Sequence, residues 1–374
     1  MHICHIMSLP MPPEDGIGNY VFNVSKHLVK MGHSVTIITR NDSLELQKYT
    51  IGSINVIKIP FVPLYPFYMH IHGKFLNRII KSIEPVVDII HIHSPLVPYI
   101  NTSLPIAVTF HTLISTENRH AEIIELNSIA AFFMGKLVSI PIEKKHLKRV
   151  NLITAVSASI AQELNEYGVD AKNVEVLGNG VDETLFTPIL KKAEDRYILY
   201  TGRLAYRKGL FDLIECAKII CDAYPNISFI IVGKGPLKEK LEKKIISYDL
   251  SARFEFKGFV DHQTLIKLYQ NAALSIVPSH YEGLPTTLLE AMSCGLPIVC
   301  TEVSGNREVV SSLNNGIIVP PKSPKEMARA VSMLLDDENL SSYLGANARK
   351  TIEEKYTWCR ISQRLADCYK RICF

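Results

Sequence analysis

Two glutamates, Glu282 and Glu290, stand in a stretch that is patterned as strand, loop, helix and strand. The apolar segment 273–277 predicts a buried strand before them, and Gly295 and Pro297 end the helical pattern after them. Carboxylates repel phosphates but accept hydrogen bonds from sugar and ribose hydroxyls, whereas the N–H groups of a loop and a helix start suit an anion. The spacing therefore fits a nucleotide-sugar site. It equally fits a solvated loop glutamate and a glutamate favoured in a first helical turn.

Two cations, Arg203 and Lys208, follow a second apolar segment, 197–201, which reads as a strand that leads into a helix. Loops at the carboxyl ends of parallel strands are where open α/β sheets bind ligands. Fixed cations there would stabilise the negative charge that develops on a departing nucleoside diphosphate. The alternative is a pair of ordinary surface cations. Arg207, between them, is expected to face solvent.

The first residues predict a βαβ unit, with a strand at 2–8, a helix at 20–31 and a strand at 35–39. Gly16 and Gly18 lie in the turn between the first strand and the helix. Gly-x-Gly at such a turn suggests a dinucleotide fingerprint, but Val21 stands where the third small residue belongs. Gly16 therefore either brings backbone close to a ligand or simply permits the turn.

Four segments carry a family resemblance: E-G-L-P-T-T-L-L-E-A-M-S-C-G-L-P-I-V at 282–299, G-R-L-A-Y-R-K-G at 202–209, V-E-V-L-G-N-G-V-D-E-T-L-F-T-P at 174–188 and D-I-I-H-I-H at 88–93. Together they resemble the family-4 retaining glycosyltransferases, enzymes of the GT-B fold, and the resemblance extends over the whole chain. It implies an α/β protein of two Rossmann-like, doubly wound domains facing across a cleft. Residues 1–188 would bind the acceptor and residues 189–355 the nucleotide sugar. Residues 356–374 would form a helix that crosses back to the N-terminal domain.

The resemblance also implies roles for single residues. Arg203 and Lys208 would hold the donor diphosphate, Glu282 the transferred sugar and Glu290 the donor ribose. His111, at the end of the predicted strand 106–111, would reach a sugar hydroxyl, whereas His91 and His93 are expected to be satisfied polar residues. The remaining donor-binding positions are Gly16 near the diphosphate, Gly283, Leu284 and Thr286 before and at the start of the helix that carries Glu290, and Gly258 and Val260 near the nucleobase.

Two positions depart from the family pattern. Asp15 replaces the first glycine of the Gly-Gly turn, and Pro285 replaces a glycine, which removes an N–H group that could reach the sugar. Pro285 is therefore expected to alter donor preference. The chain has no D-x-D segment, so we expect neither a required metal nor any cofactor besides the nucleoside-diphosphate sugar. The family relationship implies that the transferred sugar keeps its anomeric configuration.

Length and composition limit the possible folds and functions. A chain of 374 residues is long for one core and predicts two domains, and a net charge of +4 is too small to indicate nucleic-acid binding. The start lacks the charged leader and apolar run of a signal peptide, and no 18-residue apolar run predicts a membrane span. The eight scattered cysteines form no C-x-x-C and fit reduced, mostly buried thiols. We therefore expect a cytoplasmic protein.

Basic clusters raise the question of the acceptor. Residues 74–81 predict a helix with one basic and one apolar face, and Lys144, Lys145, Lys148 and Arg149 follow the apolar run 129–134. These are either ordinary surface residues or patches that draw the enzyme to an anionic membrane face, and we favour the second interpretation. The favoured function is transfer of a hexose or N-acetylhexosamine to a lipid-linked or cell-surface glycan. The rivals are a nucleotide-sugar 2-epimerase and a non-catalytic nucleotide-sugar-binding subunit.

Overall fold

The computed structural model describes residues 1–9, 11–12, 16–41, 43–64, 67–116, 133, 135–189 and 197–373. Three sequence expectations lie wholly or mostly outside these residues: the replacement at Asp15, the apolar run 129–134 and the charged linker 190–196. The described chain forms two compact units. The first contains Met1–Asn179 and Trp358–Phe374, and the second contains Gly180–Thr357.

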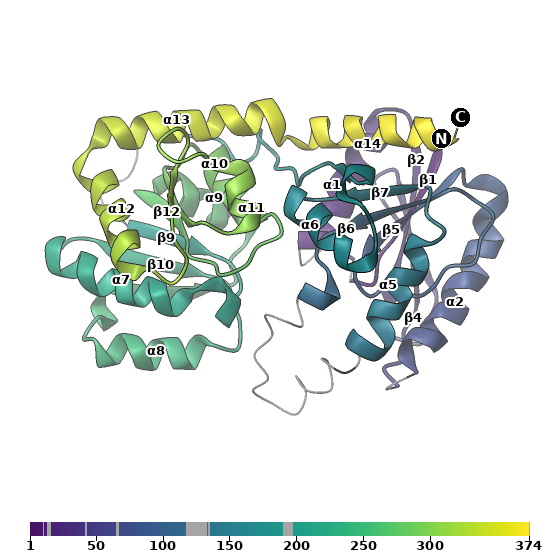
Figure 1. Ribbon diagram of the computed structural model, residues 1–374, viewed down its shortest axis with the longest axis horizontal. Helices are drawn as coiled ribbons and strands as arrows, with labels where there is room; N and C mark the ends of the chain where they lie inside the picture. Colours follow the sequence, from purple (N-terminus) through teal and green to yellow (C-terminus); the bar gives the residue numbers. More distant parts are fainter. Residues whose placement is uncertain are drawn as a thin grey trace. The chain divides into compact units, whose positions relative to one another are not determined.

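The first unit is built on a sheet in the order β3-β4-β2-β1-β5-β6-β7-β8, in which only the β3–β4 pair is antiparallel (Figure 1). Its strands are β1 (His2–Ile6), β2 (Ser34–Asn41), β3 (Gln47–Ile51), β4 (Ile54–Pro60), β5 (Ile89–Ser94), β6 (Ile106–Phe110), β7 (Leu152–Ala155) and β8 (Glu175–Val176). Its described helices are α1 (Gly16–Lys30), α2 (Tyr68–Ile83), α5 (Ile140–Leu147), α6 (Ala158–Glu163) and α14 (Trp358–Cys373). The strand order reverses between β1 and β5, as in a doubly wound sheet.

The second unit has a fully parallel sheet in the order β11-β10-β9-β12-β13-β14. Its strands are β9 (Tyr197–Thr201), β10 (Ser228–Val232), β11 (Phe254–Gly258), β12 (Leu274–Val277), β13 (Ile298–Thr301) and β14 (Ile317–Val319). Its helices are α7 (Leu210–Ala223), α8 (Lys238–Ser247), α9 (His262–Asn271), α10 (Thr286–Ser293), α11 (Ser304–Val309), α12 (Pro324–Asp336) and α13 (Glu338–Lys355). The central strands are apolar runs because a parallel sheet is covered on both faces.

The last helix, α14, belongs to the first unit and lies beside α1 (Figure 1). Trp358, the only tryptophan, is 4% exposed and meets the Tyr20 ring edge-to-face at 5.6 Å. This agrees with the expectation that the final helix returns to the N-terminal domain. Its Leu365 and Tyr369 are fully buried, so α14 completes the core of that unit.

The first unit ends at Asn179, earlier than the boundary expected after residue 188. Hydrogen bonds explain the difference, because the Phe186 carbonyl accepts one from Ser293 Oγ at 2.6 Å and one from Arg349 at 2.8 Å. The Phe186 ring also meets the edge of Tyr269. Residues 180–188 are therefore held by the second unit.

All eight cysteines are free, and five of them are buried, as the scattered spacing predicts: Cys4, Cys216, Cys294, Cys300 and Cys368. Within the described part of the chain, no helix combines the length and the hydropathy that a bilayer crossing requires.

Candidate active site

The turn after β9 and the loop after β12 pack against each other at the point where the strand order of the second sheet reverses. Gly209 ends the turn with a φ of +65°, and a Cβ on it would lie 1.9 Å from the Pro278 carbonyl oxygen. The His280 N–H donates to the Arg207 carbonyl at 2.7 Å. Only glycine permits both this backbone conformation and this approach. The close packing brings the side chains that follow the two strands together.

Lys208 and Glu282 meet at this junction. Lys208 Nζ lies 2.5 Å from Glu282 Oε1, and both side chains are largely buried, 15% and 6% exposed. Ser279 Oγ donates to the same carboxylate oxygen at 2.6 Å. Within the described residues, Glu282 Oε2 accepts no such bond, so one carboxylate oxygen remains for a ligand. Lys208, predicted to bind the diphosphate, and Glu282, predicted to bind the transferred sugar, thus form an ion pair with each other.

The backbone at Glu282 is fixed by the start of α11. The Gly305 N–H and the Ser304 hydroxyl each donate to the Glu282 carbonyl, at 3.2 Å. A Cβ on Gly305 would lie 2.3 Å from the Gly283 carbonyl oxygen, so a larger residue would displace the loop. These contacts hold Glu282 in place before any ligand arrives, as a preorganised site requires.

Glu290, on α10, accepts a hydrogen bond from the Tyr269 hydroxyl at 2.9 Å. Thr201 Oγ1, at the end of β9, lies 2.6 Å from the same hydroxyl. Desolvation raises the pKa of Glu290 to about 7, although the Tyr269 hydrogen bond acts in the opposite direction. A carboxyl group that is partly protonated at neutral pH is ready to respond to hydroxyl groups that favour its ionised form.

The remaining predicted residues of the second unit lie in loops and turns. Arg203 is exposed, and its carbonyl accepts a hydrogen bond from Tyr200. Gly283 is half-buried, Leu284 is buried, and Thr286 begins α10, after Pro285. Gly258 is the last residue of β11, Val260 follows that strand, and both are half-buried. Of the four charged residues expected to contact the donor, the structure joins Lys208 with Glu282, and it gives Glu290 a separate network.

His111 and Gly16 lie in the first unit. Gly16 is exposed at the start of α1, and His111 follows β6. His111 Nε2 lies 3.2 Å from His93 Nδ1, and the Tyr20 ring meets His111 edge-to-face at 4.8 Å. Burial lowers the pKa of His111 to about 3, so its ring is neutral at neutral pH. His91 and His93 are buried and hydrogen-bonded, in agreement with their expected structural role.

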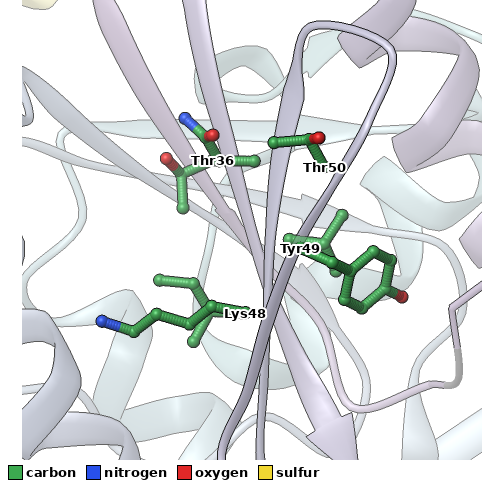
Figure 2. A pocket seen from close by; sticks show the side chains of 7 residues that line it. Thr36, Lys48, Tyr49 and Thr50 are labelled. Atoms are coloured by element: carbon green, nitrogen blue, oxygen red, sulfur yellow. The ribbon is translucent and has the colours of Figure 1, made fainter.

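Two pockets within the first unit contain none of the predicted site residues. One, of about 340 Å³, lies over β2, β3 and β4 and is lined by Thr36, Lys48, Tyr49, Thr50, Asn55, Val56 and Ile57. Figure 2 shows Lys48 and Tyr49 extending to opposite sides of their strand. The other, of about 310 Å³, lies beside β7, β8 and α14. The lining of the second pocket includes Val174 and Glu175, the first two residues of the motif at 174–188, whereas the first pocket shares no residue with the four motifs.

Three partners of the predicted residues carry no signal in the sequence. Tyr269 reads as an ordinary helix residue, yet it binds Glu290. Ser279 is one residue of a polar loop, yet it orients Glu282. His5 reads as part of a strand, yet its Nδ1 lies 2.9 Å from His93 Nε2. Each contact joins segments whose proximity depends on loop geometry or strand order, which local spacing does not encode.

Comparison with protein families gives two matches. Residues 15–185 match the family described as Glycosyltransferase Family 4, and residues 181–351 match the family described as Glycosyl transferases group 1. The two matches overlap at residues 181–185, directly after the point between Asn179 and Gly180 where the structure divides into its two units.

Relatives match along most of the chain. An uncharacterized glycosyltransferase of Methanocaldococcus jannaschii is 28% identical over 95% of this chain and 94% of its own length. The gpi3 subunit of the phosphatidylinositol N-acetylglucosaminyltransferase of Schizosaccharomyces pombe is 26% identical over 97% of this chain and 79% of its own length.

Solved structures share the fold. A sucrose-phosphate synthase of Thermosynechococcus elongatus has a TM-score of 0.81 at 20% identity, covering 99% of this chain and 98% of its own. Anabaena HepE in complex with UDP-glucose has a TM-score of 0.77 at 18% identity, covering 99% of this chain and 100% of its own. With both family matches and two doubly wound sheets, the chain belongs to the family-4 glycosyltransferases and has the GT-B fold.

Proposed function

We propose that the protein is a retaining glycosyltransferase that moves a hexose or N-acetylhexosamine from a nucleoside-diphosphate sugar to a lipid-linked or cell-surface glycan. The observation that carries this proposal is the contact between Lys208 and Glu282. This contact supports the proposal because it brings a cation that would suit a pyrophosphate together with a carboxylate whose second oxygen would accept hydrogen bonds from sugar hydroxyls. The structural neighbour with bound UDP-glucose makes uridine nucleotides the first donors to try.

The ion pair can serve both parts of a donor at once. An ammonium group has three N–H donors, so Lys208 can keep one on Glu282 and direct the others at a phosphate. Arg203, exposed on the same turn, can add a second cation as it swings toward the pyrophosphate. Loop amides around Gly283 and the start of α10 would bind further phosphate oxygens.

The reaction then needs few protein groups. The bond between the anomeric carbon and the pyrophosphate breaks, and Lys208 and Arg203 stabilise the charge gained by the leaving oxygen. The acceptor hydroxyl attacks from the side of the departing phosphate, and that phosphate takes the hydroxyl proton. The sugar therefore keeps its anomeric configuration. Glu282 and His111 would bind sugar hydroxyls, and Glu290 the ribose. No metal or cofactor takes part in this scheme.

The acceptor is inferred from the first unit. Helix α2 buries Leu76 and Ile80 and exposes Lys74, Arg78 and Lys81, so its apolar face belongs to the core and its basic face is free. Phe67, directly before α2, and Phe75, within it, are 60% and 38% exposed. Aromatic rings among cations suit an anionic lipid surface. The Schizosaccharomyces pombe relative, named for phosphatidylinositol, supports an acceptor that is held at a membrane.

The proposal is tested by following one donor through to product. Uridine, guanosine and adenosine diphosphate sugars are first screened for thermal stabilisation, since a ligand that binds only the folded state raises the midpoint. The stabilising donor is then incubated with lipid-linked acceptors, and the anomeric configuration of the product is determined by NMR. Transfer with retention is expected. Conversion of the donor without acceptor would indicate an epimerase, and binding without turnover on any acceptor a non-catalytic subunit.

A further inference from the structure

Three histidines form a continuous hydrogen-bonded line in the first unit. His5 Nδ1 lies 2.9 Å from His93 Nε2, and His93 Nδ1 lies 3.2 Å from His111 Nε2. The line runs from the sheet core to the end of β6, because His5 is fully buried, His93 is 1% exposed and His111 is half-buried. His111 is the residue of this line that can reach a ligand.

The fold explains why these rings meet. His5 pairs with His91 across β1 and β5, and His93 pairs with Thr109 across β5 and β6. His91 and His93 are two positions apart on β5 and therefore point to the same face of the sheet. Parallel register thus gathers imidazoles from three neighbouring segments at the carboxyl edge, under Tyr20 of α1.

The tautomers of His5, His93 and His111 depend on one another. Burial lowers the pKa of His5 to about 3, and that of His93 well below its ordinary value, so each ring carries one N–H and one bare nitrogen. A bond between two rings needs an N–H on one side and a bare nitrogen on the other. The proton position of one ring therefore dictates that of the next, and the line can run in only two directions.

The surroundings of His5 determine in which of the two directions the rings donate their hydrogen bonds. His5 Nε2 is buried without a hydrogen-bond partner among the described residues. If that nitrogen carried the proton, an N–H group would be buried without an acceptor, which folded proteins avoid more strictly than an unused lone pair. The proton of His5 then sits on Nδ1 and is donated to His93 Nε2. His93 in turn donates from Nδ1 to His111 Nε2.

His91 provides an internal contrast. Thr154 Oγ1 donates to the Val108 carbonyl at 3.2 Å and so accepts from Thr109 Oγ1, 2.6 Å away. Thr109 then accepts from His91 Nε2 at 2.7 Å. His91 therefore carries its proton on Nε2, and its bare Nδ1 accepts from the Tyr369 hydroxyl of α14 at 2.5 Å. Two histidines on one strand are thus held in opposite tautomers.

We infer that His5 and His93 are positioning residues that hold the His111 ring in its Nδ1–H tautomer, so that Nδ1 offers a hydrogen-bond donor. A free histidine side chain in water prefers the Nε2–H form, so the protein imposes this state. The use of that donor on a sugar hydroxyl rests on the proposed function. The tautomer itself does not, because it follows from contacts inside the first unit.

The first test is made on the unliganded full-length protein. Long-range proton–nitrogen NMR on the ¹⁵N-histidine-labelled chain distinguishes protonated from bare ring nitrogens, and a His111→Asn variant assigns the His111 signals. We expect a protonated Nδ1 for His5, His93 and His111 and a protonated Nε2 for His91. An Nε2–H state at His111 overturns the inference, whatever the enzyme's activity.

The second test uses two variants with the same side-chain outline. His5→Asn keeps an amide N–H for His93, whereas His5→Leu supplies none. We expect the Nδ1–H state of His111 to persist in His5→Asn and to shift toward Nε2–H in His5→Leu. In a transfer assay, kcat/KM should fall roughly tenfold in His5→Leu only, about the contribution of one hydrogen bond. Equal tautomer ratios at His111 in both variants would contradict the inference.

The remaining outcomes distinguish the inference from the proposed contact with the sugar and from a metal site. If the tautomers behave as expected but kcat/KM is equal in the two variants, the inference stands and the proposed contact between His111 and the sugar fails. The ligand nitrogens of His5, His91 and His93 lie within 4.8 Å of one another, close enough to share an ion. Stoichiometric zinc that shifts all three sets of signals would identify a metal site instead and overturn the hydrogen-bonded line.

Discussion

Lys208 Nζ lies 2.5 Å from Glu282 Oε1, which joins the turn after β9 to the loop after β12. Glu282 is 5% exposed, so this cation and the Ser279 hydroxyl compensate for the burial of its carboxylate. A pyrophosphate that enters beside the pair draws on the same ammonium group. The pair therefore links donor binding to the position of the carboxylate that would meet the sugar.

Removing either partner should reduce transfer. We expect Glu282→Gln and Lys208→Ala each to lower kcat/KM by at least about tenfold, because each loses a contact that strengthens as the pyrophosphate leaves. Arg207→Ala is the matched control on the same turn and should retain most activity. Steady-state kinetics with the identified donor measure the effect, and thermal unfolding confirms the fold. Unchanged turnover in both folded site variants would remove these residues from the proposed site.

Gly209 offers a sharp test of the loop packing. Gly209 and Gly258 both have a φ of +65°, but a Cβ on Gly209 would lie 1.9 Å from the Pro278 oxygen, whereas nothing lies within 4 Å of one on Gly258. Gly258→Ala should therefore cost only the conformational penalty of about 1–2 kcal/mol. Gly209→Ala should cost this penalty plus the displacement of the loop. Urea unfolding at equilibrium measures both. Equal free energies of unfolding for the two variants would mean that the loop around Pro278 moves aside at no cost in stability.

Glu290 should make donor binding depend on pH. Its pKa of about 7 in the free protein lies above the ordinary value of 4.5, and ribose hydroxyls that donate to it favour the ionised form. Binding therefore lowers the pKa and releases a proton. Affinity for a nucleotide sugar should rise with pH up to about 7 and level off above it, by at most roughly tenfold per pH unit.

Isothermal titration calorimetry in buffers of different ionisation enthalpy measures that proton release. A nucleotide sugar is the right probe, because each phosphate carries one ester and one anhydride bond, so its single acidic proton is lost far below this pH range. Glu290→Gln, which cannot ionise, is the control and should show a flat affinity between pH 5.5 and 7.5, roughly the span in which the carboxyl group titrates. Wild-type affinity that is independent of pH would show that the ribose does not engage Glu290.

The basic face of α2 should bind anionic vesicles. Lys74, Arg78 and Lys81 are exposed, and a cation near such a surface contributes about 1 kcal/mol. Replacing all three by alanine should weaken binding to phosphatidylserine-containing vesicles about a hundredfold. The control replaces three exposed lysines of α8, Lys238, Lys240 and Lys243, and should bind like the parent. Cosedimentation at low and high salt provides the measurement. Equal loss in both triple variants would point to net charge alone.

Much of the fold could be predicted because apolar runs mark parallel strands. Segments 197–201 and 273–277 correspond to β9 and β12, whose residues are nearly all buried. The edge strand β3 (Gln47–Ile51) was not predicted, because it pairs antiparallel at the margin, is mostly exposed and has no apolar pattern. Helix α2 begins at Tyr68 and not at Lys74, the start of the predicted helix, because Pro63 and Pro66 in the preceding residues 61–68 favour a loop there.

The sequence predicted which types of residue form the candidate site, but it did not predict which of them contact each other. Cations and carboxylates after neighbouring strands suggested a nucleotide sugar, yet spacing gives no sign that Lys208 and Glu282 bind each other. Their meeting depends on Gly209 and on the order of strands in the sheet. Tyr269 likewise reaches Glu290 from a different helix. Such pairs follow from three-dimensional packing, which periodicity along one segment cannot specify.

The second unit is inserted into the first. Val181 and Thr357, near its two ends, form a parallel bridge, and the Val181 N–H donates to the Tyr356 carbonyl at 2.8 Å. During synthesis the ribosome therefore delivers all of Gly180–Thr357 before Trp358 and Tyr369 emerge. The inserted unit can finish folding while the N-terminal sheet still lacks α14 over Tyr20 and His91. The part of the chain that is translated first is thus the last to mature.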